Sequence, residues 1–511
     1  MRLFEIMLLS SNVLLLILLF LPRTALRRQA MLPVSGTAAA ILLIHFIVEG
    51  GRWQLLVPYL MTPAFLAVAI IRLVRGASDR KSRVSAWITL PLKSLLALAL
   101  LASASLAVLL PVFSLPEPAG PYAIGTRIFH WVDTNREETI GADGGKREIM
   151  VQLWYPAKHD PKTETAPLVP EGMEILNAVA AEMQLPGQLI SQWQYVLTHS
   201  SLNAELSGEQ PSYPLILLSH GMGTARFLQT SQAENLASHG YIVASVEHPY
   251  STLASVFPDG RVTHNETDTA RMAKSADFRD EIGSVWTEDM RFALDQLEKM
   301  NSGQAESGFT GRIDMSRVGV MGHSYGGGAS YDIMPDDRVD AGIGMDGTLY
   351  GFRGEAAVTK PFLFFYAEDT FNAYNEIRKG KSYTDAEIER MGTTREQLNE
   401  QLKLAELEIQ QISQTLKSGN QLLYLDCSSH YNFTDLQLAS PLLPQLGFTG
   451  SIGGKRSTAI VNQVVLEFFN EHLLGRSSGL PEKPDSSYPE LRNGTSEFAE
   501  GLQETNRLPK E

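Results

Sequence analysis

The chain has 511 residues, of which 44 % are hydrophobic and 20 % are charged, so most of it is expected to fold. Its net charge of −14 is unevenly distributed, because residues 1–115 carry eleven Lys or Arg against three Asp or Glu. The rest of the chain is therefore strongly acidic, which argues against nucleic acid as a partner. The single cysteine, Cys427, excludes an internal disulfide.

Four apolar stretches lie near the N-terminus, at residues 3–22, 31–48, 53–74 and 94–114. Each approaches the ~20 residues that a helix needs to cross the hydrocarbon core of a bilayer. The first stretch differs from a signal peptide, because arginines and further apolar stretches follow it, and no small-residue cleavage site does. The sequence therefore predicts a membrane domain over residues 1–115, with about four transmembrane helices.

Basic residues in two of the loops predict how this domain is oriented. The loop after the first stretch and the loop after the third both carry several, namely Arg23, Arg27, Arg28, Arg72, Arg75, Arg80, Lys81 and Arg83. The positive-inside rule places these two loops in the cytoplasm. We therefore expect a multi-pass protein of the cell membrane whose remaining chain lies outside the cytoplasm.

From Gly120 onward, strand-like runs alternate with amphipathic helical patterns. The strand-like runs lie at 147–157, 213–221, 241–248, 317–324, 340–347, 361–369 and 421–426, and helical patterns lie between several of them. Buried strands that alternate with helices predict an α/β fold, with a mostly parallel sheet covered by helices on both faces. We place this domain at residues 120–475. The tail 476–511 is polar, rich in Pro, Ser and Glu, and is predicted to be disordered.

The stretch VGVMGHSYGGGAS, residues 318–330, predicts a nucleophile at Ser324. A G-x-S-x-G pattern is a weak indication by itself, but here a buried strand precedes it and a helix start follows it, as in a nucleophile elbow. Gly322 and Gly326 permit the close backbone approaches of such a turn, and the helix N-terminus favours negative charge beside the serine. The alternative is a tight strand–helix turn whose serine has no chemical role.

A serine nucleophile needs a base and a carboxylate that orients the base. In hydrolases with this elbow the chain order is serine, acid, histidine. Of the two histidines after Ser324, His472 lies in an amphipathic helical pattern, whereas His430 lies in the loop CSSHYNF, directly after a strand-like run. His430 is therefore the expected base. The acid is Asp346 or Asp369, which end successive strand-like runs, and the pattern alone does not decide between them.

An oxyanion hole requires two backbone N–H groups directed at the developing negative charge. The residue after the nucleophile, Tyr325, is expected to supply one of them. The loop His-Gly-Met-Gly after the run YPLILLS is expected to supply the other from Met222, because Gly221 and Gly223 let the backbone turn that N–H inward. The sequence contains no metal-ligand cluster, phosphate loop or dinucleotide motif, so neither a metal nor a cofactor is expected.

Several motifs resemble, in order and approximate spacing, the secreted-type platelet-activating factor acetylhydrolases. These are the lipoprotein-associated phospholipases A2, with an α/β-hydrolase fold, and the chain is similar to a membrane-anchored bacterial relative of them. The resemblance covers about residues 120–475. It is carried by GPYAIGT (120–126), VQLWYPA (151–157), LSHGMGTAR (218–226), VASVEHPYS (243–251), IDMSRVGVMGHSYGG (313–327), GMDG (344–347) and HYNFTD (430–435).

This resemblance implies that the serine, aspartate and histidine of the family fall on Ser324, Asp346 and His430, and it thereby favours Asp346 as the acid. It also implies oxyanion donors at Met222 and Tyr325. The implied reaction is calcium-independent hydrolysis of short or oxidised acyl esters of phospholipids.

Two regions depart from the family: the apolar front end, and a charged helical insertion at 370–420 that is a lid, a partner surface, a spacer or a solvated hairpin.

The leading hypothesis is a membrane-anchored serine ester hydrolase whose partners are its phospholipid substrate and the bilayer. One alternative is a general carboxylesterase acting on small or polyester-like soluble esters. The other is a catalytically inactive, membrane-bound binding module.

Overall fold

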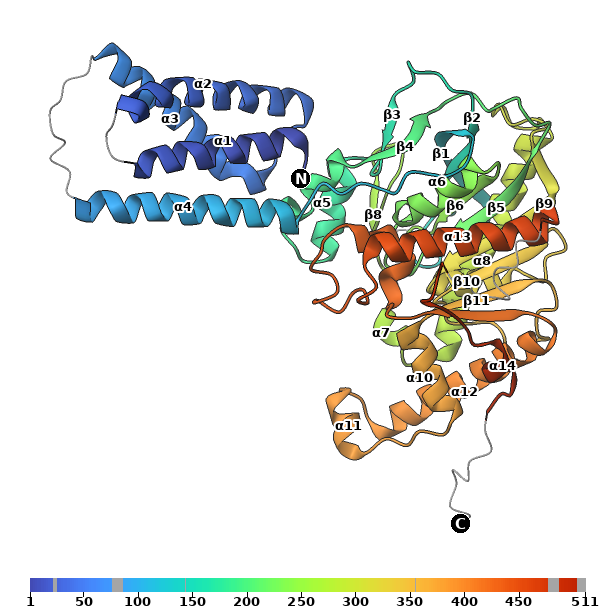
Figure 1. Ribbon diagram of the computed structural model, residues 1–511. Helices are drawn as coiled ribbons and strands as arrows, with labels where there is room; N and C mark the ends of the chain where they lie inside the picture. Colours follow the sequence, from blue (N-terminus) through green and yellow to red (C-terminus); the bar gives the residue numbers. More distant parts are fainter. Residues whose placement is uncertain (22–24, 76–85, 143, 354, 477–486, 503–511) are drawn as a thin grey trace. The chain divides into compact units, whose positions relative to one another are not determined.

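The computed structural model describes residues 1–21, 25–75, 86–142, 144–353, 355–476 and 487–502 (Figure 1). The chain divides into two units, each with its own interior. The first unit comprises Met1–Phe113 with Leu185–Val196 and Ala439–Leu442, and the second comprises the remainder. In this division, two short segments of the later sequence pack with the N-terminal helices.

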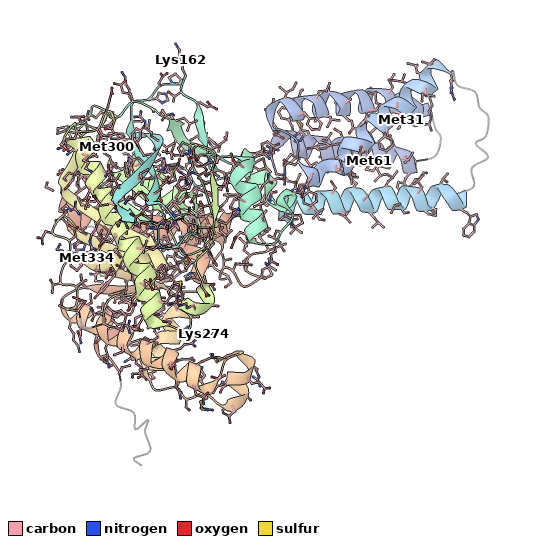
Figure 2. All side chains as sticks on the ribbon, turned by 180° about the vertical axis from the view of Figure 1, so that it is seen from behind. Met31, Met61, Lys162, Lys274, Met300 and Met334 are labelled. Atoms are coloured by element: carbon pink, nitrogen blue, oxygen red, sulfur yellow. The ribbon has the colours of Figure 1, made fainter. Side chains whose placement is uncertain are left out.

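The first unit is built from four long helices joined by short connections. They are α1 (Leu3–Phe20), α2 (Ala25–Val48), α3 (Leu56–Val74) and α4 (Ala86–Leu109), with a helical turn η1 (Trp53–Leu55) before α3. Within the described residues, the spans Leu3–Phe20, Gln29–Val48, Trp53–Val74 and Thr89–Leu109 are long and apolar enough to cross a membrane. Met31 and Met61 are buried between these helices (Figure 2). The side chains of Arg27 and Arg28, and the loop residues Arg23, Arg80, Lys81 and Arg83, lie outside the described residues.

A polar cluster joins the ends of these helices. Arg52 Nη1 donates to Glu5 Oε1 at 2.8 Å, and both side chains are buried. His45 lies between Glu49 Oε2 at 2.9 Å and the hydroxyl of Tyr59 at 2.6 Å. Ionisable groups in such an apolar unit are stable only when they are paired and hydrogen-bonded, as these are.

The two later segments of the first unit are attached to the helices by hydrogen bonds. In Leu185–Val196, which contains η2 (Gly187–Leu189) and η3 (Ser191–Tyr195), the amide of Gln192 accepts from Gln54 Nε2 at 3.1 Å. In Ala439–Leu442, Ser440 Oγ donates to the carbonyl oxygen of Leu109 at 2.7 Å.

The second unit contains an 11-stranded sheet in the order β13-β12-β11-β10-β9-β5-β6-β2-β1-β4-β3. Its central strands are parallel: β5 (Tyr213–Ser219), β6 (Ile242–Glu247), β9 (Ile313–His323), β10 (Ala341–Met345), β11 (Phe362–Ala367) and β12 (Gln421–Leu425). β2 (Lys146–Ala157) is antiparallel to both β6 and β1 (Ala123–Glu137). The outer strands are β3 (Thr165–Pro167), β4 (Leu197–Leu202) and β13 (Leu491–Asn493).

Helices cover both faces of this sheet, so its strands are apolar on both sides. Leu217 of β5 packs in one core with Trp286, whereas its neighbour Leu218 packs in the other core with Phe469. The first face carries α8 (Ala276–Asn301), α9 (Tyr325–Asp332) and α12 (Arg395–Lys417), and the second carries α6 (Thr230–Ser238) and α13 (Gly454–Leu474). The predicted α/β class with a mostly parallel sheet is confirmed.

Shorter elements connect these layers. They are α5 (Met173–Glu182), η4 (Arg226–Gln229), α7 (Thr269–Met272) and the two-stranded sheet of β7 (Ala254–Val256) and β8 (Val262–His264). The predicted insertion is helical, with α10 (Glu368–Arg378) and α11 (Asp385–Arg390) before α12. The last turns of α12 are not a solvated hairpin, because Ile409 and Ile412 are fully buried.

The C-terminal tail differs in part from the predicted disorder. β13 pairs with β12 at the edge of the sheet, and the helix α14 (Thr495–Ala499) follows it. Phe498 is fully buried, and its ring lies 5.2 Å from that of Phe371. Backbone pairing and this one buried ring outweigh the polar composition of the segment 487–502. Residues 477–486 and 503–511 lie outside the described residues.

Candidate active site

Ser324 lies on a sharp turn between β9 and α9. Its backbone has φ 55° and ψ −122°, a conformation that costs a non-glycine residue about 1–3 kcal/mol. The turn needs two glycines, since a Cβ on Gly322 would lie 2.1 Å from the carbonyl oxygen of Gly326, and one on Gly326 would lie 2.3 Å from that of Ser219. The serine is thus raised at the carboxyl end of the parallel strands, at the N-terminus of a helix.

Two further predicted residues form a hydrogen-bonded row with this serine. Ser324 Oγ lies 2.9 Å from His430 Nε2, and His430 Nδ1 lies 2.6 Å from Asp346 Oδ2. Because the carboxylate accepts the Nδ1–H, Nε2 is free to accept the serine proton. The Asp346 side chain is fully buried, whereas that of His430 is 40 % exposed, so a substrate can reach the base and not the acid.

The strand ends explain why Asp346, and not Asp369, faces the histidine. Asp346 follows β10, and its two oxygens accept from the N–H of Ala367 at 2.7 Å and from the hydroxyl of Thr370 at 3.1 Å. Asp369 lies in the first turn of α10, where its carboxylate accepts from Ser429 Oγ at 2.5 Å. Asp346 therefore contacts the imidazole of His430, whereas Asp369 contacts only Ser429 in the loop that carries His430.

His323, a residue to which the sequence assigned no role, holds the loop that carries His430. His430 opens the helical turn η5 (His430–Phe433), and its carbonyl oxygen accepts from His323 Nε2 at 3.0 Å. His323 is fully buried, and this burial, together with the neighbouring His430, holds its pKa well below the ordinary value. A neutral His323 therefore fixes the main chain of the base. Its place inside the G-x-S-x-G motif was the only sequence feature that could have drawn attention to it.

The predicted oxyanion donors lie beside the serine. A Cβ on Gly221 would lie 3.1 Å from Ser324 Cβ, so the loop after β5 runs directly past the nucleophile. Gly223 has φ +61°, and its N–H donates to the carbonyl oxygen of Ser251 at 2.9 Å. In the described part of the chain, the Met222 N–H has no backbone acceptor. The N–H of Tyr325 belongs to the first turn of α9, where such groups have no acceptor within the helix.

The other candidates from the sequence lie apart from this row. His472 stays on α13, with its ring 4.5 Å from that of Phe468. Over the described ranges, no group of three or more His, Cys, Asp or Glu side chains is arranged to hold a metal ion. The site is thus an arrangement of side chains and backbone N–H groups suited to nucleophilic attack on a carbonyl group.

Comparison with known proteins places this chain among ester hydrolases. The profile of the family described as "Platelet-activating factor acetylhydrolase, isoform II" matches residues 110–478. A probable 1-alkyl-2-acetylglycerophosphocholine esterase of Arthroderma benhamiae is 26 % identical over 74 % of this chain and 93 % of its own length. The platelet-activating factor acetylhydrolase of Cavia porcellus is 23 % identical over 70 % of this chain and 78 % of its own.

A solved structure supports the same fold. The ferulic acid esterase from Streptomyces cinnamoneus matches with a TM-score of 0.57 and 27 % sequence identity. The match covers 75 % of this chain and 99 % of that one.

Proposed function

The chain belongs to the platelet-activating factor acetylhydrolase, isoform II, family and is an ester hydrolase; from this premise we propose that it is a membrane-anchored serine esterase acting on short or oxidised acyl esters of phospholipids. The observation that carries the proposal is the row from Ser324 through His430 to Asp346, with contacts of 2.9 and 2.6 Å. It contains the nucleophile, base and orienting acid that a serine hydrolase needs.

In the proposed acylation step, Ser324 Oγ attacks the ester carbonyl carbon while His430 Nε2 takes the hydroxyl proton. The carbonyl oxygen becomes an alkoxide that accepts hydrogen bonds from the N–H groups of Met222 and Tyr325. Each such donor typically contributes about 3 kcal/mol to the stability of the transition state. Asp346 stabilises the imidazolium that forms. His430 then gives its proton to the leaving oxygen, and the acyl group stays on Ser324.

In the proposed deacylation step, the same groups act on water. His430 removes a proton from a water molecule, whose oxygen attacks the acyl carbon. The collapse of the second tetrahedral intermediate releases the carboxylic acid and returns the proton to Ser324 Oγ. No group outside the row and the two N–H donors is required for the cycle.

Two features support a phospholipid substrate and a membrane anchor. Four helices among the described residues are long and apolar enough to cross a bilayer. A catalytic domain linked to such an anchor would meet lipid esters at a raised effective concentration. The relative from Arthroderma benhamiae, a probable 1-alkyl-2-acetylglycerophosphocholine esterase, also points to the acetyl ester of a 1-alkyl glycerophosphocholine.

A second candidate function follows from the structural relative, which is described as a ferulic acid esterase. In that case the same row would hydrolyse small soluble esters without any need for a lipid surface. The mechanism would be unchanged, and only the groups that select the substrate would differ.

One assay separates these possibilities. Full-length protein in detergent is given p-nitrophenyl esters with acyl chains from two to twelve carbons, and separately phosphatidylcholine vesicles that contain 1-alkyl-2-acetylglycerophosphocholine. We expect turnover of the short esters and release of acetate from the vesicles, both lost in Ser324→Ala. Serine-dependent turnover of simple esters alone would select the second candidate. No turnover, with no labelling of Ser324 by a fluorophosphonate, would instead indicate an inactive binding module.

A further inference from the structure

A second row of serine, histidine and aspartate lies inside the sheet domain. Ser219 Oγ lies 3.0 Å from His248 Nε2, and His248 Nδ1 lies 2.9 Å from Asp289 Oδ2. All three residues are 0 % exposed. Ser219 is the last residue of β5, between β6 and β9, so no substrate can reach it. This row is therefore not a second nucleophilic site. Any effect that it has on the reaction at Ser324 must pass through the residues that it contacts.

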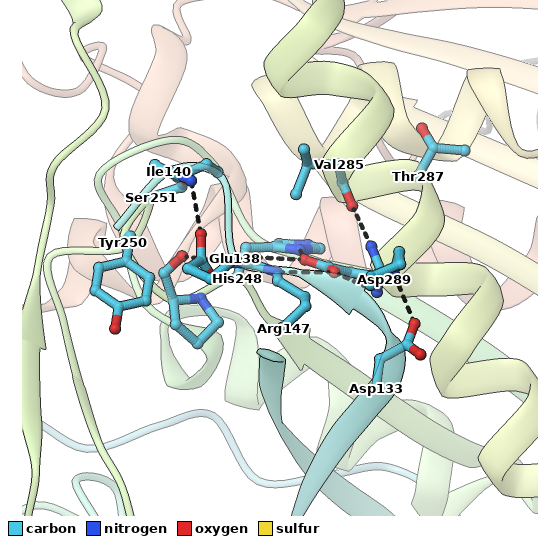
Figure 3. A network of polar contacts seen from close by, with 12 residues as sticks. Asp133, Glu138, Ile140, Arg147, His248, Tyr250, Ser251, Val285, Thr287 and Asp289 are labelled. Atoms are coloured by element: carbon cyan, nitrogen blue, oxygen red, sulfur yellow. Dashed lines mark hydrogen bonds and ion pairs between the residues drawn. The ribbon is translucent and has the colours of Figure 1, made fainter. Parts of the chain in front are cut away.

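Arginines fix the acid end of this buried row (Figure 3). Arg147 donates to Asp289 from Nε at 3.1 Å and from Nη2 at 2.6 Å, and Arg136 Nη2 donates to it at 2.8 Å. Burial alone would raise the pKa of Asp289, but Arg147 and the hydrogen bond from His248 outweigh it and keep that pKa below the ordinary value. Asp289 is thus a fixed anion, and His248 must direct its Nδ1–H toward it.

Helix α8 also contacts His248 through the ring of Trp286. Trp286 lies one turn before Asp289, and its ring stacks on that of His248 with 4.0 Å between centroids and 14° between planes. The Trp286 ring also lies 5.1 Å from the ring of His220 and 5.0 Å from that of Tyr325. One helix therefore contacts both chain segments that carry the proposed oxyanion donors.

The row continues through the main chain to the oxyanion loop. The N–H of His248 donates to His220 Nε2 at 3.2 Å, so His220 carries its proton on Nδ1 and donates it to the carbonyl oxygen of Gly221 at 2.8 Å. Thr224 Oγ1 donates to the same oxygen at 2.7 Å. His220 is fully buried, and burial followed by the effect of His248 lowers its pKa to about 3, so it stays neutral.

These contacts orient the Met222 N–H through the geometry of one peptide group. The carbonyl of Gly221 and the N–H of Met222 belong to the same planar trans peptide, in which C=O and N–H point in opposite directions. Together with the backbone N–H of Thr224, which donates to the Gly221 oxygen at 3.1 Å, the two side-chain donors therefore fix the direction in which the Met222 N–H points. An oxyanion donor that is held in this way does not have to reorient during the reaction.

We propose that Asp289, acting through His248 and His220, is a positioning residue for the oxyanion hole and sets the orientation of the Met222 N–H. This inference rests on the proposed function, because it assumes that the Met222 N–H stabilises an oxyanion. It gives the buried row a role in catalysis without contact between its members and the substrate.

The test compares Asp289→Asn with Asp133→Asn in the full-length protein. Asp133 accepts from Arg136 Nε at 2.6 Å in the same ion-pair network and does not contact His248. Each variant is assayed on p-nitrophenyl acetate and on its thionoester, in which sulfur, a weaker hydrogen-bond acceptor, replaces the carbonyl oxygen. We expect Asp289→Asn to lower kcat on the oxygen ester about 10- to 100-fold with little change in KM, as misplaced catalytic groups do. Asp133→Asn should leave kcat unchanged.

The oxygen-to-sulfur ratio of kcat/KM is the readout that a merely structural role would not change. We expect this ratio to fall in Asp289→Asn and to match the wild type in Asp133→Asn. An unchanged ratio in a folded Asp289→Asn protein would overturn the inference. A wild type that hydrolyses neither ester would instead contradict the proposed function.

A second pair of variants decides the question if Asp289→Asn does not fold. His220→Phe removes the imidazole donor to the Gly221 oxygen, whereas His220→Asn keeps an amide donor near the position of Nδ1, and neither change leaves a buried charge unpaired. We expect the ratio to fall in His220→Phe and to recover in His220→Asn. Equal ratios in the two variants would overturn the inference.

Discussion

The sheet domain contains two rows with the same order of hydrogen bonds, from serine to histidine to aspartate. In the row of Ser324, the serine has φ 55° on a tight turn, and the histidine side chain is 40 % exposed. In the row of Ser219, the serine ends a strand, and every member is fully buried. The comparison teaches that the hydrogen-bonded row is not sufficient for nucleophilic chemistry. A strained turn, access for substrate and adjacent free N–H groups are needed as well.

The two aspartates also differ in their partners. In the described structure, Asp346 accepts from His430, an amide N–H and a hydroxyl. Asp289 is bound by two arginines. None of the described arginines forms an ion pair with Asp346, whereas arginines offset the charge of Asp289. The first arrangement suits a proton-transfer cycle, and the second suits a rigid support.

The largest expected effect comes from the two serines. Ser324→Ala should lower kcat by about 10⁴- to 10⁶-fold, because it removes the nucleophile. Ser219→Ala should lower kcat by less than about tenfold, because it removes only one hydrogen bond to His248. Ester turnover and fluorophosphonate labelling of both variants check this. Labelling at Ser219 would contradict the distinction between the two rows.

The next effect concerns the carboxylate in the row of Ser324. Asp346→Asn should lower kcat about 10⁴-fold, because the histidine loses both its tautomer and the charge that stabilises its protonated form. Asp369→Asn should lower kcat less than about tenfold, since Asp369 binds Ser429 and not the imidazole. Steady-state kinetics of the two variants give the comparison. A larger loss in Asp369→Asn would reverse the assignment of the acid.

The buried row should matter most for stability. Arg147→Met removes the buried guanidinium that pairs with both Asp289 and Glu138 and should lower the free energy of unfolding by about 3–5 kcal/mol. Arg456→Met removes a more exposed pair with Glu490 and should lower it far less, because solvent screens such a pair. Denaturant unfolding of both variants in the same detergent measures the difference. Equal losses would mean that the buried network is no more important than a surface pair.

The smallest effect tests Glu408, a buried carboxyl group that accepts no hydrogen bond from any described arginine. Burial raises the pKa of Glu408 from its ordinary value of 4.5 to about 7, although the N–H of Leu349 donates to it. Between these values the folded protein binds more protons than the unfolded chain, so stability falls as pH rises from about 5 to 7.

Glu408→Gln removes this titration, and we expect it to be more stable than the wild type at pH 8 by about 1–3 kcal/mol. Thermal unfolding between pH 5 and pH 8 measures the change. Parallel Tm curves for the wild type and the variant would show that Glu408 is ionised at both pH values.

Features that depend on neighbouring residues could be predicted well. The elbow follows from a strand, two glycines and a serine within ten residues, and the four apolar helices follow from their length and composition. The position of His430 after a strand was also a local feature. The roles of these residues stay predictions, although the geometry places Ser324, Asp346 and His430 in one row.

Features that depend on packing could not be predicted in the same way. The polar tail reads as disordered, yet β13 pairs at the sheet edge and Phe498 is buried, because the edge of β12 and the ring of Phe371 are available to it. Glu408 reads as part of a charged surface helix, yet it is buried. Neither outcome could be inferred without knowing which surface each segment would meet.

The sequence by itself determined the α/β class, the strained turn at Ser324 and the apolar front end, since these depend on residues close together in the chain. Only the tertiary structure decided which carboxylate faces His430, because Asp346 and Asp369 follow adjacent parallel strands and differ in how the chain leaves each strand. It alone also brought Ser219, His248 and Asp289 together. These three residues come from separate elements, and their contacts exist only once β5, β6 and α8 have packed.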